Sequence, residues 1–309
     1  MKPAPFDYVA ARTVAEAVEA LGGTGHKAQV LAGGQSLILE MRLQRVRPDL
    51  VVDINRIREL GGMSIEDGDL RVGALVRHTA FESAEVAPGP LGTLLSRAVV
   101  NIAHPPIRSR GTMVGSFGWA HPASEWCAIG VTLEAVVEMT GPDGTRSVAA
   151  GDYFLGPHRS ERRPMELITS VRLPLLREDT GVGFLEHRRT GFCFAQVAVA
   201  ATLTVTDGAI SGARIGLANC ADRPVRARAA ERSLAGADIG PLPEGARLPD
   251  DHLFAHAGRI AAQEDAAPVA EPYADVEYKR QVIAVLVGRT LLEAAADQRA
   301  RLAVREGRR

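Results

Sequence analysis

The sequence has few cysteines, and they stand far apart. Only Cys127, Cys193 and Cys220 are present among 309 residues. No two of them have the spacing of a CxxC pair, so the chain offers neither a disulfide framework nor the ligands of an iron–sulfur cluster or a structural zinc. We therefore expect no metal site in this chain and a reducing compartment, the cytoplasm.

Long apolar runs and an excess of one charge are also missing. The sequence contains no stretch of about 18 apolar residues, and residues 1–13 lack the apolar core of a signal peptide, so neither a transmembrane helix nor a leader is expected. The 36 basic residues balance 37 acidic ones. Without a net charge or a basic cluster, the chain lacks the electrostatic footprint of a nucleic-acid-binding protein.

The length and the apolar content indicate an ordinary globular protein. With 309 residues and 46% hydrophobic residues, the chain is long enough for two domains or for one large domain. Strands alternate with helices over most of residues 1–177, whereas residues 178–309 begin with strands and end with a cluster of helices. This pattern predicts an α+β fold with a separate second domain, and a boundary near residue 178.

The first third of the chain contains clear helix and strand signals. Apolar spacing predicts a helix over 13–21, capped by Thr13 and ended by Gly22 and Gly23. A strand ending at paired glycines, a helix capped by Ser36 and a hairpin around Asp67-Gly68 follow. The remaining segments are predicted as a strand over 50–54, a helical turn over 55–60, and helices over 79–86 and 90–103.

Beyond residue 104 the pattern changes twice. Residues 105–125 are rich in glycine, proline, serine and histidine and are predicted to be irregular. Two strands joined by a Pro-Asp-Gly turn are expected over 132–150, and one more over 168–175. Residues 181–220 predict three antiparallel strands, and helices are predicted over 226–236, 251–263 and 276–298.

Two glycine-containing loops are candidates for binding an anion. A glycine pair between a strand and a helix lets backbone N–H groups approach a phosphate, although a single such loop is better explained as a plain tight turn. A second loop with glycines and hydroxyls follows about 75 residues later, and two loops facing each other could clamp a diphosphate. The first loop contains Ala32, Gly33, Gly34, Gln35, Ser36 and Leu37, and the second contains Gly111, Thr112, Gly115 and Ser116.

These loops belong to a longer series of motifs. AGGQSL at 32–37, IRSRGTMVGS at 107–116 and PASE at 122–125 are followed by VRLP at 171–174, GLANCADRPVRARAAE at 216–231 and EYKRQVIAVLVGRTLLEA at 277–294. In this order they resemble the FAD-binding medium subunit of the molybdenum hydroxylases, the group of xanthine dehydrogenase and carbon monoxide dehydrogenase. The resemblance covers essentially the whole chain.

The resemblance implies a fold and a cofactor. The fold is a two-part FAD-binding domain of the vanillyl-alcohol-oxidase type over 1–177, with its internal boundary near 55–60, followed by a smaller α+β domain over 178–309 with a three-stranded antiparallel sheet. Both glycine loops would hold the FAD diphosphate and ribityl chain. Ile102 and Ala103 would be apolar contacts on the adenine side. Glu125 would be a hydrogen-bond acceptor, and Phe194 would lie beside the isoalloxazine ring.

The resemblance also implies a function. The chain would be the electron-transfer subunit of a complex, taking electrons from a [2Fe–2S] small subunit and passing them to NAD, a quinone or another acceptor, while a molybdopterin large subunit oxidises the substrate. No general acid or base is needed in such a chain, so no catalytic residue is assigned. Carbon monoxide, an N-heterocycle and an aldehyde all remain open as substrates.

Three departures from the family pattern motivate two alternatives. Val114 replaces a glycine, and a β-branched residue rarely accepts a positive φ. Trp119 and His121 stand where small or acidic residues are common, and Trp119 would either stack on the cofactor or block its pocket. The alternatives are a stand-alone FAD-dependent oxidoreductase of a biosynthetic route and a divergent scaffold without FAD.

Other polar residues are given structural interpretations. His104, His121, His158 and His187 lack metal-ligand spacing and are expected to be core or solvated histidines. Cys127 is expected to be a buried small hydrophobic residue. Arg188 and Arg189 either face a negatively charged flavin or cap a strand at the surface.

Overall fold

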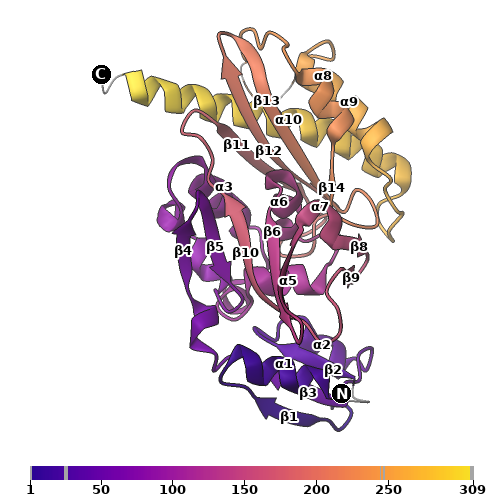
Figure 1. The fold of residues 1–309 in the computed structure, drawn as a ribbon. Coiled ribbons are helices and arrows are strands. Elements are labelled where there is room, and N and C mark those ends of the chain that lie inside the picture. Colours follow the sequence, from indigo (N-terminus) through magenta and orange to yellow (C-terminus); the bar gives the residue numbers. More distant parts are fainter. Residues whose placement is uncertain (1, 24–26, 244, 246–247, 307–309) are drawn as a thin grey trace.

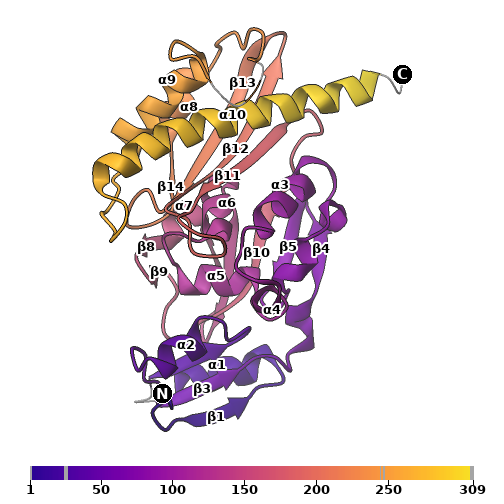
Figure 2. The same ribbon diagram turned by 180° about the vertical axis from the view of Figure 1, so that it is seen from behind.

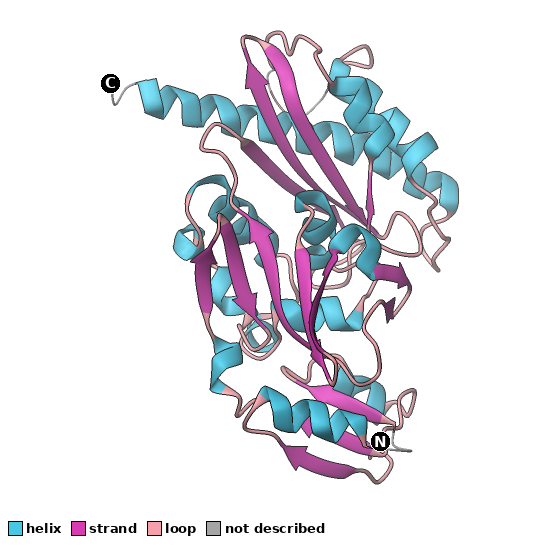
Figure 3. Ribbon diagram, in the orientation of Figure 1, coloured by secondary structure: helices cyan, strands magenta, loops and turns pink. Residues whose placement is uncertain are grey.

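Three larger sheets divide the described part of the chain into three regions. The computed structural model describes residues 2–23, 27–243, 245 and 248–306. Figures 1 and 3 show a small N-terminal sheet at one end, a larger central sheet in the middle and a C-terminal sheet with its helices at the other end. No helix in the described part of the chain is both long and apolar enough to cross a bilayer.

The N-terminal sheet is parallel. Its strands β1 (Asp7–Ala10), β3 (Leu50–Asp53) and β2 (Ala28–Leu31) lie in that order, with helix α1 (Val14–Gly22) packed against them. The predicted cap of α1 is confirmed, because the Thr13 hydroxyl accepts a hydrogen bond from the Glu16 amide at 3.1 Å.

The predicted cap of the next helix is wrong. Helix α2 (Leu37–Arg42) begins directly after Ser36 as predicted, but Ser36 has helical dihedral angles and its hydroxyl makes no capping hydrogen bond. A capping residue normally adopts an extended conformation, in which its side chain reaches the amides of the first turn. The Ser36 hydroxyl is therefore not used by the helix.

The central sheet is antiparallel. Its order is β4 (Met63–Glu66), β5 (Asp69–Gly73), β10 (Leu167–Pro174), β6 (Val136–Gly141) and β7 (Gly144–Ala149). The predicted hairpin between β4 and β5 is confirmed, since both turn residues, Asp67 and Gly68, have positive φ. A short 3₁₀ helix, η1 (Arg58–Gly61), connects this sheet to the N-terminal one.

Residues 105–125 contain helices, contrary to the prediction of an irregular segment. After α3 (Gly89–Val99) come α4 (Pro105–Arg108), α5 (Met113–Trp119) and α6 (Glu125–Leu133). The Thr112 hydroxyl caps α5 by accepting from the Gly115 amide at 2.9 Å. All nine residues of α6 are buried, so its sequence lacks the apolar and polar alternation from which a helix is predicted.

The helix predicted over 79–86 is also wrong. Two 3₁₀ turns, η2 (His78–Phe81) and η3 (Ala84–Val86), take its place. The Ser83 side chain accepts a hydrogen bond from the Glu85 amide and starts a new turn in the middle of the predicted helix. A helical turn α7 (Ala150–Tyr153) and the two-stranded sheet of β8 (Phe154–Gly156) and β9 (Arg159–Ser160) complete this part of the chain.

The C-terminal sheet has four strands where three were predicted. The strands β11 (Gly181–His187), β12 (Val197–Thr206) and β13 (Ala209–Ala218) form the expected meander, and β14 (Val225–Arg226) adds a short fourth strand. A strand of two residues is too short to show an alternation of apolar and polar residues in the sequence. The helices that follow this sheet along the chain are α8 (Arg228–Leu234), α9 (Leu253–Ile260), which continues into a π-helical turn (Ala261–Asp265), and α10 (Val276–Glu306).

Helices cover both faces of this sheet. Helix α10 lies across the strands in both views of the molecule (Figures 1 and 2), and a methyl group on Gly181 or Gly183 would overlap its backbone. On the other face α6 packs so closely that a methyl group on Gly216 would overlap Thr132. Helix α6 therefore joins the two halves of the molecule, and the domain boundary near residue 178 stays a prediction.

Candidate functional site

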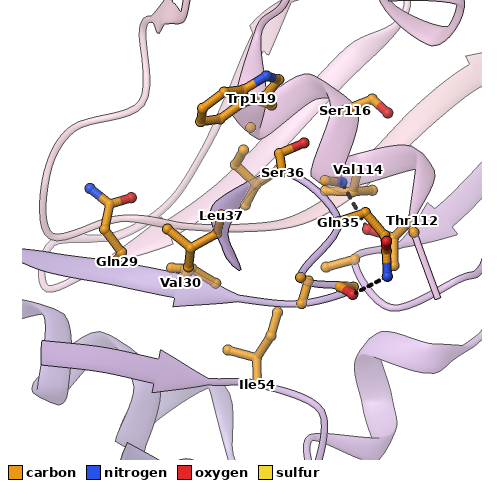
Figure 4. A pocket seen from close by; sticks show the side chains of 18 of the residues that line it. Gln29, Val30, Gln35, Ser36, Leu37, Ile54, Thr112, Val114, Ser116 and Trp119 are labelled. Carbon is orange, nitrogen blue, oxygen red and sulfur yellow. Dashed lines mark hydrogen bonds between the residues drawn. The ribbon is translucent and has the colours of Figure 1, made fainter. Parts of the chain in front are cut away.

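A cleft lies between the N-terminal and central sheets, where the two glycine loops meet. All ten loop residues predicted from the sequence line it, together with side chains of β2, η2, α5 and β10. Its free space is about 900 Å³ when the part open to solvent is included. We call residues 32–37 and 111–116 with their surroundings the glycine-loop cleft (Figure 4).

The two loops touch at their glycines. A methyl group at Gly33 would overlap the carbonyl oxygen of Arg110 and approach the Cα of Gly111 to 2.7 Å. Gly34 has φ +75°, a conformation that residues with a side chain rarely adopt. Glycine is therefore required in the first loop both for close contact and for backbone geometry.

The first loop presents unused hydrogen-bond donors. Within the described residues, the backbone N–H groups of Gly33, Gly34, Gln35 and Ser36 donate to no protein acceptor. The Ser36 hydroxyl is also free of a capping bond. Successive unpaired N–H groups beside a cleft form a cradle for an anion such as a phosphate.

Helix α5 forms the opposite wall with little side-chain bulk. Gly115 and Gly118 are exposed on it, and Ser116 is half-buried, so a ligand can lie directly against the helix. Val114 is absent from the residues with positive φ and is buried within the helix, so its β-branched side chain causes no backbone strain. Trp119 also lines the cleft (Figure 4). Its ring centroid lies 4.5 Å from that of His158.

A polar brace holds the two loops together. The side-chain amide of Asn55 donates to the Ala32 carbonyl at 2.8 Å. The Arg77 guanidinium donates to the Asn55 side-chain oxygen at 2.6 Å and to the Arg110 carbonyl. Sequence reasoning missed Asn55 and Arg77, because nothing in the local sequence indicates that they bridge loops about 75 residues apart.

Two further residues of the cleft were also missed. His78 is buried, with 5% of its surface exposed, and its Nδ1 accepts a hydrogen bond from the Trp126 indole at 2.9 Å. Burial, with Arg108 and Arg77 nearby, lowers the pKa of His78 to about 4, so the ring is neutral. Arg162 also lines the cleft, and burial lowers the pKa of its guanidinium.

The other four predicted site residues do not line the glycine-loop cleft. Ile102 packs in the core, and Ala103 has φ 45° and accepts a hydrogen bond from Arg108 at 3.1 Å through its carbonyl. Asn101, the residue before Ile102, accepts two hydrogen bonds from Arg188, at 2.6 and 3.0 Å. Arg188 thereby connects the start of the C-terminal sheet to the segment before α4.

Glu125 belongs to a buried carboxyl cluster. It faces Glu186, whose side chain is 1% exposed and whose carboxyl oxygens receive no hydrogen bond in the described part of the chain. The Arg188 Nε lies 3.3 Å from Glu186. Burial raises the pKa of both carboxyl groups, and the neighbouring Glu125 raises that of Glu186 further, so the pair retains a proton. We call Glu125, Glu186, Arg188 and Asn101 the carboxyl cluster.

Phe194 is exposed and stacks on a histidine. Its ring lies 4.2 Å from that of His121 at an interplanar angle of 10°, and 59% of the residue is exposed. Burial and neighbouring His158 lower the pKa of His121 to about 4. The other three histidines also contact protein side chains: His158 contacts Trp119, His104 contacts Phe192, and His187 lies 2.6 Å from the Tyr278 hydroxyl. In the described residues, no cluster of three His, Cys, Asp or Glu side chains is placed to hold a metal.

Comparisons with known proteins cover the chain almost completely. A family model described as the FAD-binding domain in molybdopterin dehydrogenase matches residues 4–176, and one described as the CO dehydrogenase flavoprotein C-terminal domain matches residues 184–294. The 6-hydroxypseudooxynicotine dehydrogenase complex subunit alpha of Paenarthrobacter nicotinovorans is 33% identical, over 95% of this chain and 96% of that protein.

Two more similarities involve a curated relative and a solved structure. Caffeine dehydrogenase subunit beta of a Pseudomonas strain is 33% identical, over 99% of this chain and 100% of that protein. The carbon monoxide dehydrogenase structure from Hydrogenophaga pseudoflava that lacks the Mo-pyranopterin moiety contains a chain with a TM-score of 0.87 and 31% identity, which covers 96% of this chain and 99% of that one.

Proposed function

Because the chain belongs to the family of FAD-binding subunits of molybdenum hydroxylases, we propose that it carries electrons between partner subunits and a final acceptor. Its cofactor is FAD and its activity is that of an oxidoreductase subunit. We assign the glycine-loop cleft to the FAD diphosphate. The contact between Gly33 and the second loop carries this assignment.

The residues of the cleft fit a diphosphate. The free N–H groups of the first loop and the Ser36 hydroxyl are hydrogen-bond donors for phosphoryl oxygens, and the bare face of α5 lets the cofactor approach the backbone. Asn55 and Arg77 keep both loops in place before the cofactor arrives, so less order has to be created on binding. When bound, FAD supplies the capacity to accept and pass on electrons.

We assign the second group of predicted residues to the rest of the cofactor. Ile102, Ala103, Glu125 and Phe194 would surround its other parts, as the family resemblance implies. The contact of Arg188 with Asn101 supports this assignment, because it fixes the segment that leads into Ile102. The Arg188 guanidinium is also held beside Glu186, its Nε 3.3 Å from that carboxyl group.

The proposed partners are a [2Fe–2S] small subunit and a molybdopterin large subunit. Relatives are named as subunits or medium chains of dehydrogenases for caffeine, carbon monoxide and 6-hydroxypseudooxynicotine, which supports a multi-subunit assembly. Electrons would enter from the iron–sulfur subunit and leave to NAD, a quinone or another acceptor. The substrate would be selected by the large subunit, and a cytoplasmic location remains a prediction from the cysteine count.

The test is the composition of the protein isolated from its own host. An affinity-tagged full chain is purified under mild conditions, and its flavin, iron and molybdenum contents are measured per chain. We expect FAD together with iron and molybdenum, and bleaching of the flavin absorbance when a substrate of the complex is added. An untagged culture carried through the same steps is the control for contaminating metalloproteins.

The alternatives give different results in the same preparation. A protein with FAD but neither metal, which oxidises a substrate on its own, is a stand-alone oxidoreductase. A protein that neither contains flavin nor takes up added FAD is a scaffold, and this result overturns the proposal. The free donors of the first loop favour FAD over the scaffold, because a scaffold gains nothing from unpaired N–H groups beside a cleft.

A further inference from the structure

His78 lies where the two glycine loops meet. It begins η2, lines the cleft and donates its backbone N–H to the Gly111 carbonyl at 3.0 Å. A methyl group at Gly111 would lie 2.6 Å from the His78 Nε2. The imidazole edge is therefore in direct contact with the second loop, next to the point where that loop touches Gly33.

The tautomer of His78 follows from its neighbour. The Trp126 indole nitrogen can only donate, and it donates to the Nδ1 of His78. In a neutral imidazole one ring nitrogen accepts and the other carries the proton, so the proton is on Nε2. Among the described residues, Nε2 has no protein acceptor. An unused N–H donor therefore stands on a buried ring at the wall of the cleft.

The surroundings keep this donor neutral. The guanidinium groups of Arg77 and Arg108 lie near the ring, and burial acts in the same direction, so the pKa of His78 is about 4. Arg108 is itself fixed by Glu82 at 2.7 Å, and Arg77 by Asn55 at 2.6 Å. Neither arginine is free to move away from the imidazole, so a charged ring would be strongly disfavoured.

We propose that the His78 Nε2–H donates a hydrogen bond to a phosphoryl oxygen of the FAD diphosphate, with Trp126 as the positioning residue that keeps the proton on Nε2. This assignment rests on the proposed function, because it requires the diphosphate to lie between the glycine loops. It adds a side-chain donor to the backbone N–H groups and the serine hydroxyl of the first loop.

The test compares FAD, ADP and riboflavin binding to the flavin-free full chain. His78→Phe keeps a ring and removes the donor, His78→Gln keeps an N–H donor, and exposed His256→Phe in α9 is the matched control. A hydrogen bond to a charged group has a strength that corresponds to roughly a 10- to 100-fold change in affinity. We expect His78→Phe to weaken FAD and ADP by this factor but not riboflavin, and His78→Gln to restore part of the loss.

A second measurement separates positioning from general damage. Nitrogen NMR shifts of the imidazole distinguish the two tautomers, and we expect the Nε2–H form in the wild type and a mixture in Trp126→Phe, with up to roughly 10-fold weaker FAD binding. The proposal is overturned if His78→Phe binds FAD as the wild type does, or if FAD, ADP and riboflavin all weaken alike. A wild type that does not bind FAD overturns the proposed function instead.

Discussion

The glycine-loop cleft and the carboxyl cluster are built in opposite ways. The cleft presents backbone N–H groups, and its glycines leave room for a ligand without a single buried negative charge on the loops themselves. The carboxyl cluster places the buried carboxyl groups of Glu125, in α6, and Glu186, in β11, beside the half-buried guanidinium of Arg188, which follows β11. One site is prepared for an anion, and the other holds a proton.

The difference explains how each site depends on the rest of the molecule. The cleft requires only that two loops touch, and the Asn55–Arg77 brace provides this contact within the first half of the chain. The carboxyl cluster forms only when the C-terminal sheet packs on α6. Disturbing the cleft should therefore affect ligand binding, whereas disturbing the cluster should affect stability and its pH dependence.

The largest effect is expected from Gly33→Ala. The added methyl group overlaps the Arg110 carbonyl, so the loops have to separate and the N–H groups lose their alignment. We expect FAD affinity to fall roughly 100-fold or more, which corresponds to about 2.7 kcal/mol. The measurement is an FAD titration of the flavin-free protein, followed by fluorescence.

The matched control is Gly61→Ala. Gly61 lies in η1, and nothing stands within 4 Å of a methyl group placed there. We expect wild-type affinity from this variant. If Gly33→Ala retains wild-type affinity as well, the loop contact is not what holds the cofactor, and the assignment of the cleft to the diphosphate fails.

This contrast also explains what could be predicted from the sequence. Gly33 and Gly111 were identified because a glycine requirement of the backbone is visible in the local sequence, and all ten loop residues line one cleft. His78 and Arg77 were not found, since their roles depend on Trp126 and Asn55, which lie 48 and 22 residues away. Local patterns carry no information about such pairs.

The same limit applies to the fold. Helix α1 and the β4–β5 hairpin were predicted because a cap, a spacing and an Asp-Gly turn are local signals. Helix α6 was missed because it is buried on every side, and the helix predicted over 79–86 is broken by the Ser83 turn. Tertiary packing decides the structure at these positions, and the apolar period alone does not report it.

The next largest effect concerns stability and not binding. We expect a large loss of unfolding free energy at acid pH. The pKa of His78 is lowered from 6.5 to about 4 by folding, so the unfolded chain binds more protons between these values. Stability is therefore lost as the pH falls below 6.5, by up to about 3 kcal/mol for this residue. We expect His78→Gln to reduce that loss in urea unfolding at about pH 7 and pH 5. Since His121 shifts in the same direction, part of the loss remains. An unchanged pH dependence would contradict the buried, neutral state of His78.

The carboxyl cluster should show the opposite pH dependence. Folding raises the pKa of Glu125 and Glu186 above the ordinary value of 4.5, so the folded chain holds more protons and stability declines as the pH rises toward about 8. The decline is expected to be on the order of 2 kcal/mol. Glu186→Gln replaces the protonated carboxyl group by an amide and should flatten this decline in urea unfolding at about pH 6 and pH 8, whereas exposed Glu59→Gln should not.

The Cys193 thiol and Arg188 also face Glu186, and both are unchanged in the Glu186→Gln variant. A decline that persists in Glu186→Gln would place its origin outside the cluster.

The smallest effect on stability is expected from Phe194→Ala. This variant distinguishes a surface contact with His121 from a place beside the flavin. Phe194 and Phe192 are both more than half exposed, and each ring lies 4.2 Å from a histidine ring, His121 and His104 respectively. Because exposed ring pairs contribute little, either alanine variant should lose less than about 1 kcal/mol of unfolding free energy. If Phe194 also lies beside the flavin, Phe194→Ala alone should weaken FAD several-fold and shift the visible spectrum of the bound flavin, while ADP binding stays constant. Equal effects of the two variants on FAD would remove Phe194 from the cofactor site and leave it as a surface contact of His121.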